Sequence, residues 1–222
     1  MPIRSCPNVS ILGDSISTLG GYTPESDVFY DPNFSRSTGV KSADDTWWMK
    51  VIQGIGGKLL INNSYAGSTV CRNGYQPASA PWRIAKLRNQ DISPDYILIF
   101  SGLNDVALYW PPEEFKEHYD DMLHHLKQAY PSTSICCATL CRGFVKNPDW
   151  PLFINWNHCH PLALYNQSIR EAVWEANCHL ADLSSFQKEY SSIDGVHPDS
   201  DGMELLAQMW LHCIKNCSIT AK

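Results

Sequence analysis

Short apolar runs alternate with longer polar or amphipathic stretches along most of this chain. Such runs are typical of buried strands, and five of them occur, at residues 9–12, 58–62, 96–100, 134–140 and 179–183. The stretches between them carry helix start and stop signals, which predict helices at residues 47–52, 80–89, 113–130, 161–178 and 199–215. This alternation predicts an α/β fold in which a parallel sheet lies between helices on both faces.

The composition narrows the class of protein. The chain has 222 residues, 44% hydrophobic and 18% charged, as expected for one soluble domain over residues 1–222. A net charge of -6 argues against nucleic acid and anionic membrane as partners. No apolar run approaches the roughly 20 residues of a membrane span. The first strand begins too early for a signal peptide, so we expect a cytoplasmic protein, with its oligomeric state open.

Nine cysteines invite a disulfide interpretation. An odd number cannot all pair, and Cys136, Cys137 and Cys141 lie in or beside an apolar strand, as small core residues do. Without an export signal, reduced thiols in a cytosol are the better account.

The first apolar run ends in a turn that presents Ser15. We expect Gly13 to give the backbone the freedom for that turn. A serine needs a base to become a nucleophile, and near the other end of the chain Asp194 and His197 lie three residues apart. The order serine, acid, histidine is one in which the Ser-His-Asp triad occurs.

Two further strands end in segments rich in Gly and Asn. The run at 58–62 is followed by Gly67, and the run at 96–100 is followed by Asn104. Open α/β sheets bind ligands beyond the carboxyl ends of their strands. The N–H groups of Ser15 and Gly67 and the side-chain amide of Asn104 are therefore candidate oxyanion-hole donors.

These blocks together resemble those of the SGNH (GDSL-type) hydrolase superfamily. They stand in the family's order as GDS at 13–15, the glycine at 67, GxND at 102–105 and DxxH at 194–197, and residues 17–24 and 45–48 further resemble a bacterial branch. The resemblance implies a three-layer flavodoxin-like fold with a mainly five-stranded parallel sheet. It also implies a cofactor-free acyl-enzyme reaction with Ser15 as nucleophile, His197 as base and Asp194 as its orienting acid. An α/β-hydrolase elbow would need glycine where Ser17 stands.

Other polar residues have simpler interpretations. Asp14 and Asp105 are expected to orient loops, and Asp199 is expected to cap a helix. His158 and His160 are spaced to chelate a metal on extended backbone, but no clear third ligand accompanies them, so we predict no metal site.

Two non-periodic segments, 22–34 and 142–160, are unusually aromatic, and long loops of this kind are often functional. One interpretation is that their rings only pack the loops onto the domain. The other is that they form the walls of a pocket above Ser15, with Trp150, Trp156 and Arg142 binding substrate. Neither segment has many Leu, Ile or Val for a long lipid. We therefore expect an esterase for short acyl groups, acetyl above all, on a carbohydrate or similar polar alcohol.

Three alternatives stay open. A lipase or thioesterase, or an acyltransferase, would use the same triad on a different small-molecule ester or acceptor. A non-catalytic sugar-binding protein would have no need of Ser15, Asp194 and His197 together, and turnover of p-nitrophenyl acetate above a Ser15→Ala control separates it from an enzyme.

Overall fold

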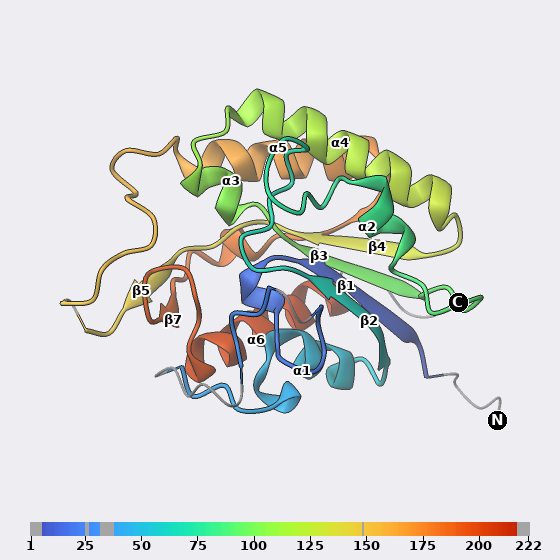
Figure 1. Ribbon diagram of the computed structural model, residues 1–222, viewed down its shortest axis with the longest axis horizontal. Coiled ribbons are helices and arrows are strands. Elements are labelled where there is room, and N and C mark those ends of the chain that lie inside the picture. Colours follow the sequence, from blue (N-terminus) through green and yellow to red (C-terminus); the bar gives the residue numbers. More distant parts are fainter. Residues whose placement is uncertain (1–5, 25–26, 32–37, 148, 217–222) are drawn as a thin grey trace.

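The computed structural model describes residues 6–24, 27–31, 38–147 and 149–216. Its centre is a sheet of five parallel strands in the order β2-β1-β3-β4-β6 (Figure 1). The strands are β1 (Asn8–Gly13), β2 (Lys58–Ser64), β3 (Tyr96–Phe100), β4 (Ser134–Ala138) and β6 (His179–Ala181). A second sheet of two parallel strands, β5 (Gly143–Val145) and β7 (Tyr190–Ser192), lies beyond the carboxyl end of β4.

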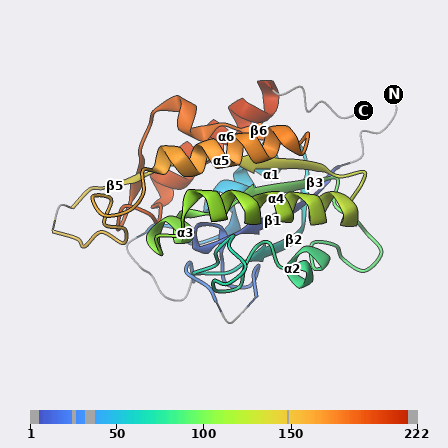
Figure 2. The same ribbon diagram turned by 90° about the horizontal axis from the view of Figure 1, so that it is seen from above.

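Helices cover both faces of the main sheet, which gives three layers (Figure 2). Helices α1 and α6 pack together on one face, and α4 and α5 pack together on the other, with α2 beside α4. The helices are α1 (Trp47–Gly54), α2 (Pro81–Ala85), α3 (Leu103–Ala107), α4 (Pro112–Ala129), α5 (Leu162–Glu175) and α6 (Ser200–Asn216). Three short 3-10 helices are η1 (Ser15–Ser17), η2 (Ala43–Asp45) and η3 (Leu183–Phe186). No helix among the described residues is both long and apolar enough to cross a membrane.

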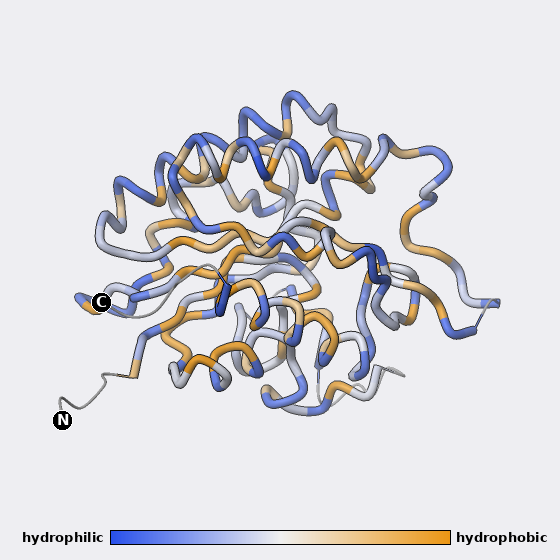
Figure 3. Tube along the Cα trace, turned by 180° about the vertical axis from the view of Figure 1, so that it is seen from behind, coloured by the Kyte–Doolittle hydropathy of each residue, from blue (hydrophilic) through white to orange (hydrophobic). Residues whose placement is uncertain are grey.

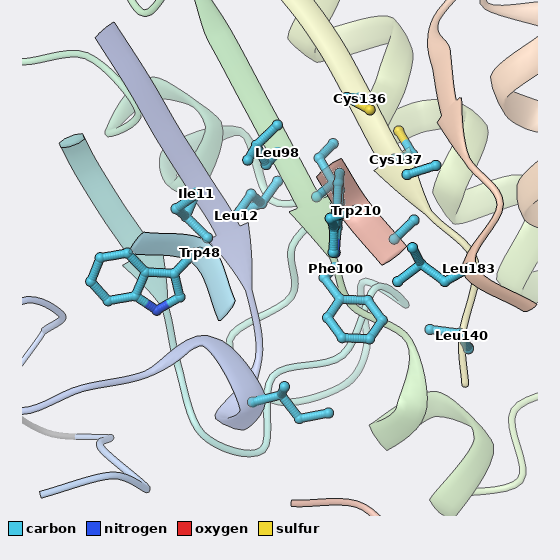
Figure 4. Packing of buried hydrophobic residues seen from close by; sticks show 14 of the residues in the cluster. Ile11, Leu12, Trp48, Leu98, Phe100, Cys136, Cys137, Leu140, Leu183 and Trp210 are labelled. Carbon is cyan, nitrogen blue, oxygen red and sulfur yellow. The ribbon is translucent and has the colours of Figure 1, made fainter. Parts of the chain in front are cut away.

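The hydrophobic core lies on both sides of the central strands. Phe100 of β3 meets the Trp47 ring of α1 edge-on with ring centroids 5.7 Å apart, and Figure 4 shows Phe100 and Trp210 of α6 among the buried side chains. Trp47 stacks on Trp210 with ring centroids 5.1 Å apart, so the two helices on that face share one aromatic contact. In Figure 3 the strands are largely orange while the outer turns of the helices are blue, the pattern of a sheet buried on both faces.

The strand order determines where a ligand site can lie. From β1 the chain crosses to β2 on one side and then to β3 on the other, so the direction of winding reverses next to β1. At such a point the connections leave the carboxyl ends of adjacent strands in opposite directions and open a crevice between them. The residues that follow β1, β2 and β3 therefore gather at one edge of the sheet.

The predicted α/β fold, its parallel five-stranded sheet and its flanking helices are confirmed. Several details of the sequence prediction are wrong. The fourth strand ends at Ala138 and not at 140, the last strand of the main sheet ends at Ala181 and not at 183, and the helix predicted over 80–89 covers only Pro81–Ala85. The segment 142–160 contains β5, and α3 and β7 were not predicted. The strands β5 and β7 have three residues each, too few to show an alternating pattern.

Gly13 has a different role from the predicted one. It is not among the described residues with positive φ, so its turn needs no special backbone freedom. A Cβ at this position would instead lie 2.6 Å from Ser17 Oγ. Glycine is required at 13 because η1 folds back closely onto the end of β1.

Candidate active site

Ser15 begins η1, directly after β1. The Asp14 side chain caps this turn by accepting the N–H of Ile16 at 3.1 Å. Asn62 of β2 donates its side-chain amide to the Ser17 carbonyl at 2.9 Å, which holds the end of the turn. These bonds fix the backbone of the serine on both sides, and Asp14 orients the loop, as predicted.

The turn between β7 and α6 carries Asp194 and His197. Oδ1 of Asp194 accepts the N–H groups of Val196 at 3.1 Å and His197 at 2.8 Å. Gly195, which follows Asp194, has φ +83°, a left-handed conformation that other residues adopt only with strain. The aspartate therefore builds the turn that brings its own second oxygen to the histidine ring.

Long-range hydrogen bonds hold the backbone around the histidine. The Tyr190 hydroxyl donates to the Val196 carbonyl at 2.6 Å, and the Tyr30 hydroxyl donates to the Pro198 carbonyl at 2.8 Å. Asp199 then caps α6, as predicted, with Oδ1 accepting the N–H of Gly202 at 2.9 Å. His197 is thus placed by a loop far away in sequence as well as by its own turn.

The structure brings the three predicted residues into one hydrogen-bonded chain. His197 Nε2 lies 2.9 Å from Ser15 Oγ, and His197 Nδ1 lies 2.7 Å from Asp194 Oδ2. Ser15 and His197 are only 5% and 3% exposed. Burial alone would raise the pKa of Asp194, but the His197 ring and the two backbone N–H groups hold that pKa below its usual value. A carboxylate in this state favours the tautomer with a proton on Nδ1, which leaves Nε2 free to accept the serine proton.

The candidate oxyanion donors lie on the loops after β1, β2 and β3. Gly67 has φ +80°, so the loop depends on glycine there. Asn104 Nδ2 donates one proton to the Ser68 carbonyl at 2.8 Å, which leaves its second proton for another acceptor. The backbone N–H groups of Ser15 and Gly67 bond to no backbone acceptor among the described residues.

Asp105 holds the same loop. Its buried carboxylate accepts the N–H groups of Val70 at 2.9 Å and Cys71 at 2.9 Å, so it orients the loop as predicted. Burial raises the pKa of Asp105 against the effect of these donors. Burial also raises the pKa of Asp14 to about 7, opposed by the Ile16 N–H and reinforced by the charge of Asp105.

Sequence reasoning missed Arg83, whose side chain is fully buried beside these carboxylates. Its guanidinium donates to the carbonyl of Gly13 at 3.0 Å and to the side-chain oxygen of Asn63 at 3.0 Å. It also donates to Ser68 Oγ and to the carbonyls of Asn63 and Gln76. One cation thereby ties together the ends of β1 and β2 and the loop that carries Gly67. The sequence does not indicate this burial, because Arg83 is a single arginine in a short amphipathic segment.

The predicted substrate-binding residues lie in the segment between β4 and α5. The Arg142 guanidinium lies 4.9 Å from the Trp156 ring centroid, and Trp156 Nε1 would lie 3.7 Å from a Cβ on Gly195. These two residues are therefore beside the histidine turn. Trp150 is 36% exposed, and it makes no ring contact with His197 among the described residues.

Two phenylalanines that were not singled out as substrate-binding residues contact the histidine ring. Phe29 stacks on His197 with ring centroids 3.6 Å apart and planes 6° apart. Phe153 meets the same ring edge-on at 5.2 Å and 80°, and its N–H donates to the Asp194 carbonyl at 2.8 Å. Both aromatic segments thus reach the base, although Phe34 of the first segment lies outside the described residues.

His158 and His160 are both exposed in the same segment. Within the described parts of the chain, no three His, Cys, Asp or Glu side chains are grouped so that they could hold a metal ion.

The chain is similar to known proteins over almost its whole length. The model of the GDSL-like lipase/acylhydrolase family matches residues 7–214. A GDSL-like lipase from Bacteroides ovatus is 26% identical, with a TM-score of 0.71 over 96% of this chain and 100% of that chain. One from Bacteroides uniformis is also 26% identical, with a TM-score of 0.68 over 96% of this chain and 97% of that chain.

More distant structures share the fold. A carbohydrate esterase family 2 enzyme from Corynascus thermopiles is 14% identical, with a TM-score of 0.64 over 98% of this chain and 68% of that chain. A search among curated proteins gives no match.

Proposed function

Since the chain belongs to the GDSL-like lipase/acylhydrolase family and is a hydrolase of ester bonds, we propose that it removes short acyl groups, acetyl above all, from a carbohydrate or another small polar alcohol. The single observation that carries the catalytic part is the hydrogen-bonded chain from Ser15 through His197 to Asp194. The catalytic residues, the oxyanion donors and the substrate are all part of this proposal.

The first half of the proposed reaction makes an acyl-enzyme. Ser15 Oγ attacks the ester carbonyl carbon while His197 Nε2 takes the serine proton, and Asp194 stabilises the resulting imidazolium through Nδ1. The negative carbonyl oxygen binds the N–H groups of Ser15 and Gly67 and the free proton of Asn104 Nδ2. The carbonyl then re-forms, the C–O bond to the alcohol breaks, and His197 gives its proton to the departing alcohol oxygen.

The second half releases the acid. His197 takes a proton from water, whose oxygen attacks the acyl carbon, and the proton returns to Ser15 Oγ as the enzyme's ester bond breaks. An acceptor alcohol in place of water would give acyl transfer, so product analysis with added alcohols tests that alternative.

The surroundings of the base support a short acyl group and a polar alcohol. Phe29 and Phe153 cover His197 closely, and Ser15 is almost buried, which favours a compact acyl group over a long chain. The stacked pair of Arg142 and Trp156 beside Gly195 combines an aromatic face with a fixed cation. Such a pair suits the faces and hydroxyl groups of a sugar ring.

A chain-length series tests the proposal. We expect kcat/KM on p-nitrophenyl esters to be highest for acetate and to fall steadily toward palmitate. Ser15→Ala is expected to abolish both turnover and labelling by a fluorophosphonate probe. A maximum at long chains would refute the short-acyl assignment in favour of a lipase or thioesterase, and labelling of a different serine would refute the nucleophile.

The alcohol side is tested separately on acetylated sugars. Trp156→Ala and Arg142→Ala are expected to raise KM for an acetylated sugar while leaving KM for p-nitrophenyl acetate close to wild type, with Trp150→Ala compared alongside. Wild-type KM for the sugar in all three variants would contradict the proposed substrate-binding role.

A further inference from the structure

Residues 27–30 extend from the loop that carries Gly67 to the turn that carries His197. At one end the Asp27 carbonyl accepts the N–H of Ala66 at 2.8 Å, and the Tyr75 hydroxyl donates to Asp27 Oδ1 at 2.7 Å. Ala66 directly precedes Gly67, and Tyr75 Cδ1 would lie 3.6 Å from a Cβ on Gly67. This end of the segment is therefore bonded to the loop of the candidate oxyanion hole.

The other end of the segment is linked through Thr18 to the backbone of Ser15 and is hydrogen-bonded to the histidine turn. The N–H of Phe29 donates to Thr18 Oγ1 at 2.9 Å, and Thr18 Oγ1 donates to the Ser15 carbonyl at 2.9 Å. The neighbouring Tyr30 hydroxyl holds the Pro198 carbonyl. Four consecutive residues thus touch the loops of the oxyanion donors, the serine and the histidine.

The Phe29 ring itself lies on the imidazole. The planes are 6° apart and the centroids 3.6 Å apart, so the Phe29 ring stacks on one face of His197. Phe153 meets the same imidazole from a nearly perpendicular plane. The imidazole is left with its two nitrogen edges directed at Ser15 and Asp194. A ring confined in this way cannot swing off its hydrogen bonds without first displacing Phe29.

We propose that Phe29 is a positioning residue for catalysis, which holds the His197 ring in line with Ser15 while residues 27–30 tie that ring to the oxyanion loop. The inference rests on the proposed function, because it requires His197 to act as the base. Displacing a catalytic group by about 1 Å can cost about 100-fold in rate. The face of an aromatic ring is also attractive to a cation, so the stack persists when the imidazole takes up the serine proton.

A double-variant cycle on p-nitrophenyl acetate tests this role. Phe29→Leu keeps an apolar side chain of similar length but removes the flat ring. We expect it to lower kcat by about 10- to 100-fold with KM changed less than twofold. In the His197→Ala background the same substitution should cost less than twofold, because the ring that Phe29 positions is then absent. Phe29→Tyr keeps the ring face and should recover most of the lost kcat.

The chain offers a matched control in Phe186, which meets a second histidine, His212, edge-on at 5.3 Å. Phe186→Leu should leave kcat at the wild-type value, and thermal unfolding should show that each variant is folded. An equal loss from Phe29→Leu in both backgrounds, or a loss confined to KM, would overturn the positioning role in favour of packing or substrate contact. The proposed function fails by a different result, namely full activity of His197→Ala or Ser15→Ala with Phe29 intact.

Discussion

The two halves of the candidate site are held in place by different physical means. The serine side (residues 13–18, 63–76, 83 and 101–105) contains three buried ionisable groups, Asp14, Asp105 and Arg83, whose hydrogen bonds go mainly to backbone. The histidine side (residues 190–199) is held by the Asp194 carboxylate, by tyrosine hydroxyls and by the stacked Phe29 ring.

The difference follows from where each half lies. The serine side is built on the ends of central strands, where loops run through the interior and their backbone groups need buried partners. The histidine side is built on a turn between a three-residue strand and α6, so packing from other loops must fix it. Substitutions on the serine side should therefore cost stability, and those on the histidine side should cost rate.

The largest expected effect is on the histidine side. Asp194→Asn retains an oxygen for the N–H groups of Val196 and His197, so the turn should stay folded. Its amide cannot stabilise the imidazolium and favours the wrong tautomer, so kcat should fall by about 10⁴-fold. Steady-state kinetics with a thermal unfolding curve measure both. A loss of less than tenfold would remove Asp194 from the mechanism.

On the serine side, Arg83→Met should lower the stability of the protein, in contrast to Asp194→Asn, which should lower its rate. The substitution leaves the buried side-chain oxygen of Asn63 without its donor and leaves the Gly13 carbonyl only the Tyr65 N–H at 3.4 Å, so the free energy of unfolding should fall by about 3–5 kcal/mol. Urea denaturation measures this change. Arg83→Lys should recover only part of it, because an ammonium group cannot reproduce the guanidinium fork.

Arg88 provides the control for this prediction. It is exposed five residues further on, where it donates to the Ala129 carbonyl at 3.2 Å. Arg88→Met should change the free energy of unfolding by less than about 1 kcal/mol. Equal effects of the two substitutions would contradict the buried role of Arg83.

Asn104→Ala sharpens the comparison, because Asn104 is on the serine side but is proposed to act in the transition state. Removing one oxyanion donor should lower kcat by about 10²–10³-fold with little change in KM. Asn104→Asp removes the donor while keeping the shape and should be similarly slow. An effect on KM alone would place Asn104 in substrate binding instead.

The most gradual effect is a pH dependence that arises from Asp14. Its pKa is raised to about 7 in the folded protein against an ordinary value of 3.8, so between these values the folded state keeps a proton that the unfolded state has lost. Stability of the wild type should fall as pH rises from about 4 to 7, by at most about 1.4 kcal/mol per pH unit. Relative to Asp14→Asn, this loss should level off above pH 7.

Comparing urea denaturation of the two proteins across that pH range isolates the Asp14 contribution from the carboxylates whose pKa is lowered, such as Asp194. A difference in stability that does not change with pH would show that Asp14 titrates near its ordinary value.

Much of the site could be predicted because its chemistry lies at element ends. Ser15, Gly67 and Asn104 each follow an apolar strand, and the carboxyl ends of parallel strands share one edge of a sheet. Asp194 and His197 are close in sequence, so a glycine-containing turn is enough to join them. A pattern of residue types and spacings carries this information without any knowledge of packing.

The remaining parts depend on contacts between distant segments. Arg83 acts through oxygens at the ends of β1 and β2 and on the loop after β2, and Phe29 acts on a ring 168 positions further along the chain. The pairing of β5 with β7 likewise joins two three-residue segments that show no strand pattern of their own. The sequence by itself determined the βα order, the sheet and the candidate catalytic residues, because strand and turn propensities are local. Only the tertiary structure decided which buried cation and which aromatic ring hold those residues in place, because such contacts form between segments whose separation in sequence does not indicate their distance in space.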